Sequence, residues 1–256
     1  MKLRLIDTGF NTPSMNMAID EALLTSKKPV LRFYRWKPAG LSIGYFQSTQ
    51  AINVEGCKKR GVEIVRRLTG GNAVLHDKEL TYSFIINEDE MPKSVVESYK
   101  MISKGLLQGL RNLKLKPEMN IDVKKEEKSA VCFKDPSWYE LLVNRKKIVG
   151  SAQTRKNGKI LQHGAVLIDI DVEKYCSLFN NCSEELIKKV KQRMTSINDE
   201  LNKKVDYERV KKAMISGFEK ELGIKFEASE LIKEELKSAE ELEKNKYSTD
   251  KWNYIR

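Results

Sequence analysis

The chain has 256 residues, of which 40% are hydrophobic and 32% are charged, and its formal net charge is +11. A chain of this length forms one large domain or two small ones, and its composition excludes collagen-like, low-complexity and disordered classes. No apolar run approaches the roughly 18 residues that a membrane helix needs. Asp7 also breaks the apolar stretch that a signal peptide would require. We therefore expect a cytoplasmic protein without membrane contact.

The positive charge has two interpretations. One is a solvated surface rich in lysine, and the other is a partner of opposite sign, such as nucleic acid, an anionic lipid surface or an acidic protein. Lysines are interspersed with glutamates, as in the KKEEK stretch at 124–128, and no nucleic-acid-binding motif is present. The pattern therefore disfavours nucleic acid and leaves the other partners open.

The four cysteines are expected to be reduced thiols, as is usual in the cytoplasm. They form no C-x-x-C pair and the chain has only two histidines, so we expect no metal site. Cys57 precedes a basic stretch and is interpreted as a surface thiol, whereas Cys176 and Cys182 are interpreted as packing residues. The fourth, Cys132, lies in a segment with other chemical signals.

Taken in chain order, the elements begin with a helix, since Thr12 is a suitable N-cap and Pro13 suits the first turn. A polar segment over 114–128 reads as a surface loop, and Asn157-Gly158 is a strong hairpin signal. Strands are predicted over 30–36, 41–46, 64–68, 73–76, 80–86, 130–133, 139–143, 147–153 and 160–169. Further helices are predicted over 53–60, 94–113, 171–179, 183–193, 206–222 and 229–244.

Strands dominate the first two-thirds of the chain and helices the last third. This order favours an α+β fold with mixed, largely antiparallel sheets and flanking helices over a doubly wound parallel sheet. No linker is visible, so we expect a single domain over 1–256, with a core over about 30–225 and a helical C-terminal tail. The aromatic residues Trp36, Tyr45 and Phe46 are expected in the core.

The first stretch with chemical signals runs from Arg66 to Asp77. A predicted strand ends there in paired glycines, Gly70 and Gly71, which allow a tight turn and a close approach to a ligand. Two arginines precede the turn and His76 follows it, but the spacing of a Walker A loop is absent. For the paired glycines alone, an ordinary hairpin turn with exposed arginines is the better explanation.

The second stretch is the predicted strand that begins at Lys147. Its small residues, Gly150, Ser151 and Ala152, are typical of a strand that another backbone or a ligand approaches closely. A lysine ammonium near Cys132 would favour the thiolate, which is the form that attacks a thioester. From spacing alone, however, Cys132 with Lys147 is one of many possible pairings.

Together these residues resemble the catalytic domain of the biotin/lipoate protein ligase and lipoyl transferase superfamily, and the resemblance covers essentially the whole chain. The resemblance implies a fold related to the cores of class II aminoacyl-tRNA synthetases. The matching motifs are Arg66-Arg67-Leu68-Thr69-Gly70-Gly71-x-Ala73-Val74-x-His76-Asp77, Lys147-Ile148-Val149-Gly150-Ser151-Ala152, Gln162-His163-Gly164, Asn16-Met17-Ala18-x-Asp20-Glu21 and Trp252-Asn253.

Within this superfamily the chain most resembles octanoyltransferases of the LipM type. The residues at 129–133, 136–140 and 150–155 match that subgroup, and the chain lacks the C-terminal accessory domain of full-length lipoate ligases. Asn72 stands where ligases usually have a third glycine, which is compatible with transferase chemistry or neutral. The resemblance implies that Cys132 carries the acyl group and that Lys147 lowers its pKa.

The resemblance further implies substrate-binding roles for one set of residues, whereas His76 and His163 are expected as pocket or structural histidines rather than bases. The implied substrate-binding residues are Arg66, Thr69, Gly70, Gly71, His76, Gly150, Ser151, Ala152 and His163.

The implied donor is octanoyl-acyl carrier protein, whose acidic surface suits the positive chain, and the acceptor is a lipoyl-domain lysine, as in the glycine cleavage H protein. No ATP, metal or other cofactor is expected, and the protein is expected to be a monomer that binds no nucleic acid. Alternatives are an ATP-dependent lipoate-protein ligase without the accessory domain and an amidotransferase that moves octanoyl between lipoyl domains. Biotin ligase is disfavoured, because its Gly-Arg-Gly-Arg-type loop is missing.

Overall fold

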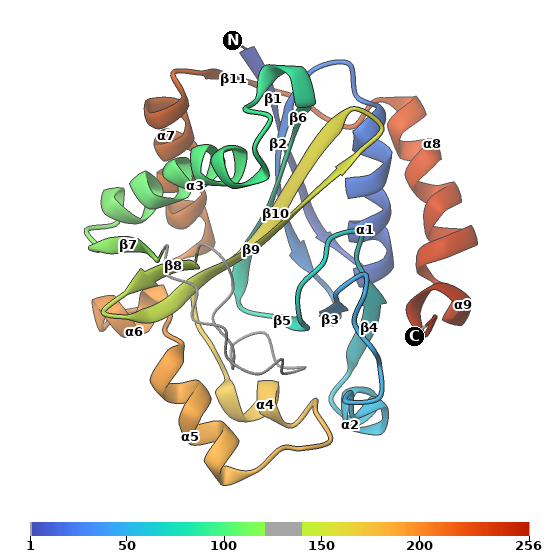
Figure 1. The fold of residues 1–256 in the computed structure, drawn as a ribbon, viewed down its shortest axis with the longest axis vertical. Coiled ribbons are helices and arrows are strands. Elements are labelled where there is room, and N and C mark those ends of the chain that lie inside the picture. The colour runs from blue at the N-terminus through green and yellow to red at the C-terminus, as the bar shows by residue number, and fades with distance from the viewer. Residues whose placement is uncertain (1, 121–139, 256) are drawn as a thin grey trace.

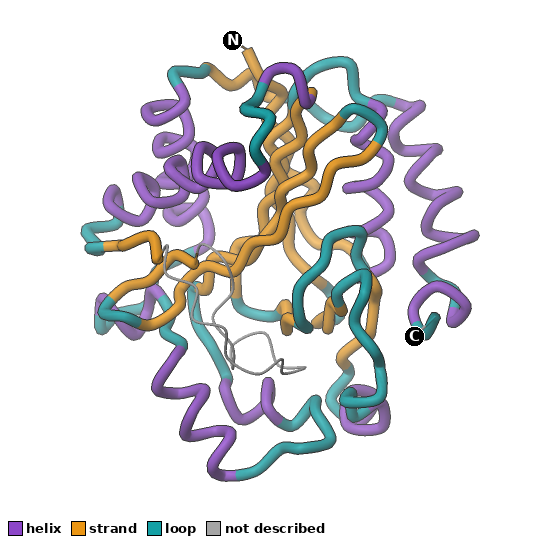
Figure 2. The backbone as a smooth tube through the Cα atoms, viewed as in Figure 1, coloured by secondary structure: helices purple, strands orange, loops and turns teal. Residues whose placement is uncertain are grey.

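The computed structural model of the chain describes residues 2–120 and 140–255. Two β-sheets and the helices around them make up the fold (Figures 1 and 2). Cys132 and the strand predicted over 130–133 lie outside the described residues. Within the described part, no helix combines the length and the apolar character that crossing a membrane requires.

The larger sheet contains eight strands of the described chain, in the order β11-β1-β2-β6-β10-β9-β8-β7. β1 runs parallel to both β11 and β2, and every other neighbouring pair is antiparallel. The strands are β1 (Lys2–Asn11), β2 (Val30–Trp36), β6 (Glu79–Asn87), β7 (Pro117–Asn120), β8 (Glu140–Val143), β9 (Lys146–Lys156), β10 (Lys159–Leu167) and β11 (Lys225–Ala228).

A smaller sheet lies beside the α1 side of the larger one and supplies the glycine-rich turn. Its order is β4-β3-β5, with β3 parallel to β4 and antiparallel to β5. The strands are β3 (Ala39–Ile43), β4 (Val62–Arg66) and β5 (Val74–His76). The turn between β4 and β5 therefore carries the residues that sequence motifs had singled out.

Helices cover both faces of the larger sheet. On one face α3 packs against α7 so closely that a Cβ on Gly217 would lie 2.4 Å from the carbonyl oxygen of Gly105. On the other face α1 packs against the sheet, with α8 outside it (Figure 1). The helices are α1 (Pro13–Ala22), α2 (Val54–Lys59), α3 (Val95–Asn112), α4 (Val172–Cys176), α5 (Glu184–Arg193), α6 (Ile197–Leu201), α7 (Tyr207–Leu222), α8 (Lys233–Leu242) and α9 (Asp250–Asn253).

The α+β fold with a mixed, largely antiparallel sheet is confirmed, and most predicted elements lie within a few residues of their expected bounds. Thr12 caps α1 as predicted, and Asn157 and Gly158 both have positive φ in the β9–β10 turn. Some elements were missed: β1, β11, α6 and α9 were not predicted, and β7 occupies residues expected in a loop. Since β1 lies inside the sheet, the packed core begins before the expected residue 30.

The strands that prediction missed depend on tertiary pairing. β7 is a four-residue strand that begins with Pro117 and, in the described part of the chain, pairs only with β8 at the end of the strand order. Proline and polar residues lack strand propensity, so the pairing partner determines the conformation. β11 is equally short and has no buried residue, and its parallel pairing with β1 stabilises it as a strand.

Candidate active site

A cavity of about 110 Å³ lies between the larger sheet and the smaller sheet. Its wall on the larger sheet comes from β2, β6, β9 and β10, and its other wall comes from β3, β5 and the turn before β5. Among the residues predicted from sequence, the structure brings together Gly71, His76, Lys147, Gly150, Ser151, Ala152 and His163 around this cavity. The two motif stretches, which are far apart in sequence, therefore meet in one place.

Small residues on β9 and β10 leave the space for the cavity. Gly150 pairs with Ala165 and Ser151 pairs with Gly164 across the two strands. A Cβ on Gly164 would lie 2.3 Å from the carbonyl oxygen of Gly150, so no larger residue fits there without displacing β9. Small residues are needed at these positions because the two strands approach each other closely and larger side chains would fill the cavity.

Lys147 is a buried cation at the cavity wall. Its side chain is only 4% exposed, and Nζ donates a hydrogen bond of 2.7 Å to Oε1 of Glu140. The β8–β9 hairpin brings the two residues together, and its turn residues Asn144 and Arg145 both have positive φ. Because a buried ammonium is stable only with a compensating charge, Glu140 accounts for the presence of Lys147 here. The predicted partner of Lys147, Cys132, lies outside the described residues.

The glycine-rich turn after β4 is shaped by Arg67. Its Nη2 donates to the carbonyl oxygens of Gly70 at 2.7 Å and Asn72 at 2.9 Å, which lie on either side of Gly71. Gly71 has φ +89°, a backbone conformation that side chains other than glycine rarely adopt. Arg67 lines the cavity, yet sequence reasoning did not place it in the site, although it stood in the recognised motif.

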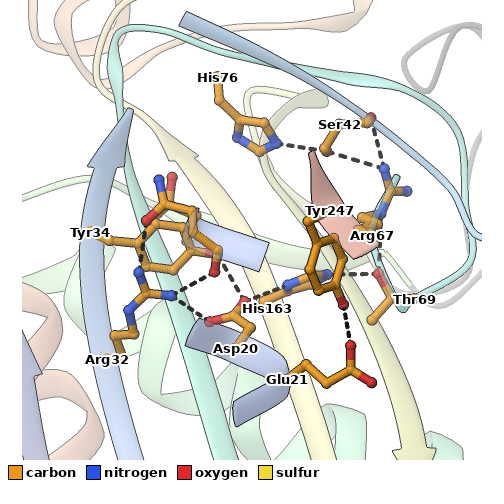
Figure 3. A network of polar contacts seen from close by, with 12 residues as sticks. Asp20, Glu21, Arg32, Tyr34, Ser42, Arg67, Thr69, His76, His163 and Tyr247 are labelled. Carbon is orange, nitrogen blue, oxygen red and sulfur yellow. Dashed lines mark hydrogen bonds and ion pairs between the residues drawn. The ribbon is translucent and has the colours of Figure 1, made fainter. Parts of the chain in front are cut away.

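His163 stands in a buried chain of polar groups (Figure 3). Its Nε2 lies 2.7 Å from Oγ1 of Thr69 and its Nδ1 lies 2.9 Å from Oδ2 of Asp20. Burial lowers the pKa of His163 below its ordinary value, and the Asp20 carboxylate offsets this only in part. For Asp20 burial acts in the opposite direction, but hydrogen bonding from His163 and the charge of Arg32 hold its pKa below the usual range. A neutral imidazole against a carboxylate is therefore expected at neutral pH.

His76 stands in a second chain of the same type. Its Nε2 lies 2.7 Å from Oγ of Ser42, and its Nδ1 bonds to Oε1 of Glu79. Trp36 stacks on the imidazole with ring centroids 4.1 Å apart, and its indole N–H donates to Thr81 at 2.7 Å. Trp36 thus lines the cavity with a fixed orientation, and the expectation that it serves only the core was incomplete.

Three predicted site residues, Arg66, Thr69 and Gly70, are not among the residues that line the cavity. Thr69 bonds to His163 from behind the wall. The fully buried Arg66 donates to the backbone carbonyl oxygens of Gly44, Tyr45 and Gln47, and also to those of Trp252 and Asn253.

Arg66 therefore joins the C-terminal helix α9 to a loop beside the glycine-rich turn. Trp252 adds to this connection, because its indole N–H donates a hydrogen bond of 2.9 Å to the carbonyl oxygen of Arg66. Phe46 in this loop is 71% exposed, so its expected place in the core was wrong.

The described cysteines do not offer a reactive thiol at the cavity. Cys57 is buried, contrary to its interpretation as a surface thiol, and burial raises its pKa to about 11. Burial likewise raises the pKa of Cys176 to about 11. Cys182 is exposed rather than packed, so that prediction was also wrong. Within residues 2–120 and 140–255, no three His, Cys, Asp or Glu side chains gather as metal ligands.

Comparison with known proteins gives two consistent sets of relatives. The family model described as the lipoyl protein ligase A/B catalytic domain matches residues 12–219. The octanoyltransferase LipM of Bacillus subtilis (strain 168) is 46% identical over a 272-residue alignment, which covers 99% of this chain and 98% of that protein. The octanoyltransferase LipM of Staphylococcus aureus (strain NCTC 8325 / PS 47) is 44% identical, with 97% of both chains covered.

Solved structures give the second set. A bi-partite lipoate protein ligase from Thermoplasma acidophilum superposes with a TM-score of 0.85 at 27% identity, covering 99% of this chain and 96% of that one. A lipoate-protein ligase A bound with ATP gives a TM-score of 0.82 at 29% identity, with 99% of both chains covered. The residues that the family model matches, 12–219, include every element that lines the cavity.

Proposed function

The chain belongs to the family of lipoyl protein ligase A/B catalytic domains, and we propose how it performs the octanoyl transfer for which its curated relatives are named. It is an octanoyltransferase of lipoate biosynthesis. The octanoyl group arrives as a thioester on acyl carrier protein, passes to Cys132, and leaves as an amide on a lysine of a lipoyl domain. The glycine cleavage H protein is the expected acceptor, and the reaction takes place in the cytoplasm.

The first step transfers the acyl group to the enzyme. The thiolate sulfur of Cys132 forms a bond to the octanoyl carbonyl carbon, and the bond from that carbon to the phosphopantetheine sulfur breaks. The phosphopantetheine leaves and takes up a proton. Backbone N–H groups or the Lys147 ammonium stabilise the oxyanion that forms on the carbonyl oxygen. One thioester replaces another, so the step needs no ATP.

The second step transfers the acyl group to the acceptor. The lysine amine of the lipoyl domain attacks the octanoyl carbon, the bond to the Cys132 sulfur breaks, and the amine loses a proton. A thioester becomes an amide, which is more stable, so this step runs downhill and needs neither ATP nor a metal ion.

One observation supports this proposal most: Lys147 is a buried, ion-paired cation at the wall of a cavity that small residues keep open. A buried cation at this place favours a thiolate and the oxyanion of its reaction, because both negative charges are stabilised by a nearby positive charge. The net charge of +11 gives the same chain an attraction to an acidic carrier, which salt should weaken.

Intact-protein mass spectrometry after mixing with octanoyl-acyl carrier protein, without ATP, tests the proposal. We expect one octanoyl adduct, located on Cys132 by peptide mapping and absent from Cys132→Ala. Cys182→Ala is the matched control, because this exposed cysteine should leave loading unchanged. Lys147→Ala should slow loading by about 10²-fold or more, the lower range for loss of a group that assists proton transfer or charge stabilisation. Normal loading of Cys132→Ala would contradict the proposal.

An ATP-dependent lipoate ligase is the second candidate function, because the ligase bound with ATP shares this fold. The single chain of the bi-partite ligase is also matched over 96% of its length, so chain length does not separate the two activities. An assay that supplies lipoate, ATP and a lipoyl domain distinguishes a ligase from an octanoyltransferase. A ligase would modify the domain under these conditions and would retain that activity in Cys132→Ala. Octanoyl transfer between two lipoyl domains without the carrier would instead indicate an amidotransferase.

A further inference from the structure

Two chains of hydroxyl, imidazole and carboxylate groups run through the cavity wall, and one arginine connects them. Figure 3 shows the arginine, both hydroxyl groups, both imidazoles and the Asp20 carboxylate. In each chain the hydroxyl oxygen lies 2.7 Å from Nε2 of the histidine, and Nδ1 of that histidine bonds to a carboxylate. All six groups are buried. The chains are Thr69–His163–Asp20 and Ser42–His76–Glu79.

The connecting residue is Arg67. Its Nε donates to Oγ1 of Thr69 at 3.1 Å, and its Nη1 donates to Oγ of Ser42 at 3.2 Å. A guanidinium group has donors and no acceptor, so both hydroxyl oxygens must act as acceptors toward it. With the arginine on one lone pair of each hydroxyl oxygen, the hydroxyl proton is oriented toward an unprotonated Nε2 of the nearby imidazole.

This arrangement determines which nitrogen of each imidazole carries the proton. Nε2 accepts from the hydroxyl group and is therefore unprotonated, so in the neutral ring the proton lies on Nδ1. The carboxylates require the same assignment, because Asp20 and Glu79 accept from Nδ1. The arginine at one end and the carboxylate at the other thus specify one tautomer for both His76 and His163.

We propose that Arg67 is a positioning residue that holds both cavity imidazoles in the Nδ1–H tautomer, so that each ring presents an unprotonated Nε2 to a hydroxyl group in the wall that receives the acyl chain. The consequence for substrate binding rests on the proposed octanoyl transfer, whereas the tautomers themselves do not. An imidazolium beside a bound alkyl chain would have to give up its solvation, which weakens binding.

The charges around the two rings agree with this assignment. Burial lowers the pKa of His163, the Asp20 carboxylate offsets this in part, and the positive charge of Arg67 lowers the pKa further. His76 is held from its other face by the stacked Trp36 ring. Among residues 2–120 and 140–255, the charged groups that face the two imidazoles from the elements packed against them are Asp20, Arg32, Arg67, Glu79 and Lys147.

The two-histidine composition of the chain makes the tautomers directly measurable. Long-range ¹H–¹⁵N spectra of protein labelled at histidine should show two imidazoles, each assigned by replacing the other with glutamine. At pH 7 we expect Nδ1 to be protonated and Nε2 to be unprotonated in both rings. A protonated Nε2 on either ring at this pH would overturn the proposal, whatever the enzyme's substrate.

Two replacements of Arg67 separate its positioning role from a purely structural one. Both shorten the side chain and weaken its bonds to the glycine-rich turn, but they differ in hydrogen-bond chemistry. Lysine is a donor only, so Arg67→Lys should keep the Nδ1–H tautomers. Glutamine also has an acceptor, so in Arg67→Gln the hydroxyl groups are free to reverse and the Nε2–H tautomer should appear. The exposed Arg60 provides a control in Arg60→Gln, which should leave both rings unchanged.

Kinetics give the functional readout. In Arg67→Gln the KM for octanoyl-acyl carrier protein should rise about tenfold between pH 8 and pH 6, as expected for a ring that takes up a proton within this range and must be neutral for binding. The wild type and Arg67→Lys should change less than about twofold over this range. Equal pH dependence of KM in all three proteins, or the same tautomers in both variants, would refute the positioning role.

If the Arg67 variants fail to fold, two smaller substitutions test the same hydrogen bonds. Thr69→Val removes the hydroxyl group that faces His163, and Ser42→Ala removes the one that faces His76. Each should alter the spectrum of its own ring and leave the other as an internal control. If the wild-type protein shows the expected tautomers but is not loaded with octanoyl, the proposed function is refuted and the tautomer assignment is not.

Discussion

Gly44 lies where two loops of the cavity wall touch, and replacing it with alanine should force them apart. A Cβ at this position would lie 1.8 Å from the carbonyl oxygen of Gly71, whereas real Cβ atoms essentially never come within 3.0 Å of another heavy atom. The obstructing atom belongs to the backbone, so one loop must shift by more than an ångström. That shift disrupts the hydrogen bond of 2.9 Å between the N–H of Tyr45 and the carbonyl oxygen of Thr69.

The expected loss of unfolding free energy is about 2–4 kcal/mol, which combines about 1–3 kcal/mol for overpacking with about 1 kcal/mol for the hydrogen bond. Urea unfolding monitored by tryptophan fluorescence measures it. Gly70→Ala is the matched control, because among the described residues its Cβ meets only the Phe46 ring, at 4.0 Å, and it should change stability by less than about 0.5 kcal/mol. Equal stability of the two variants would refute the argument from loop contact.

Three further predictions concern buried charge and thiols. Asp20→Asn should cost about 3–5 kcal/mol in urea unfolding, because it leaves the Arg32 guanidinium buried without its carboxylate. The pKa of His163 is lowered in the fold, so the unfolded chain binds its proton more readily and stability should fall as pH drops below about 6.5. His163→Gln should reduce this slope, by at most about 1.4 kcal/mol per pH unit. Iodoacetamide at pH 8 should alkylate Cys182 and leave Cys57 unmodified, because burial raises the pKa of Cys57 to about 11.

Each of these three predictions has an outcome that would contradict it. A loss under about 1 kcal/mol for Asp20→Asn would mean that Arg32 finds other compensation. An unchanged acid slope in His163→Gln would show that the lowered pKa of that ring does not contribute to stability. Peptide mapping that finds Cys57 alkylated in the native protein, at a rate similar to Cys182, would contradict its burial.

Local sequence signals explain most of the fold. The Thr12 cap, the Asn157-Gly158 turn and the periodic apolar residues are local, and the corresponding elements formed as predicted. β7 and β11 have weak signals of their own and exist because a neighbouring strand pairs with them. Their detection requires knowledge of the sheet order, which no local pattern contains.

The site, like the fold, was predicted only in part, because some of its contacts depend on tertiary structure. Motifs identified the small residues of β9, Lys147 and the two histidines, and the structure brings these around one cavity. Arg66 was expected at the substrate, but its guanidinium is occupied by backbone carbonyl groups on the loop after β3 and on α9. Adjacent residues on a strand end face opposite sides, so Arg67 rather than Arg66 faces the cavity. The Glu140 partner of Lys147 depends on the β8–β9 register, which the motifs do not specify.

The most direct test of the proposed reaction is a chase of the isolated octanoyl-enzyme. Protein loaded from octanoyl-acyl carrier protein is separated from the carrier and mixed with a lipoyl domain in the absence of ATP, and intact mass is followed in a single turnover. The account predicts that octanoyl leaves Cys132 and appears on the acceptor lysine at least as fast as steady-state turnover. An octanoyl-enzyme that persists while the complete system transfers octanoyl would show that Cys132 is not on the reaction path.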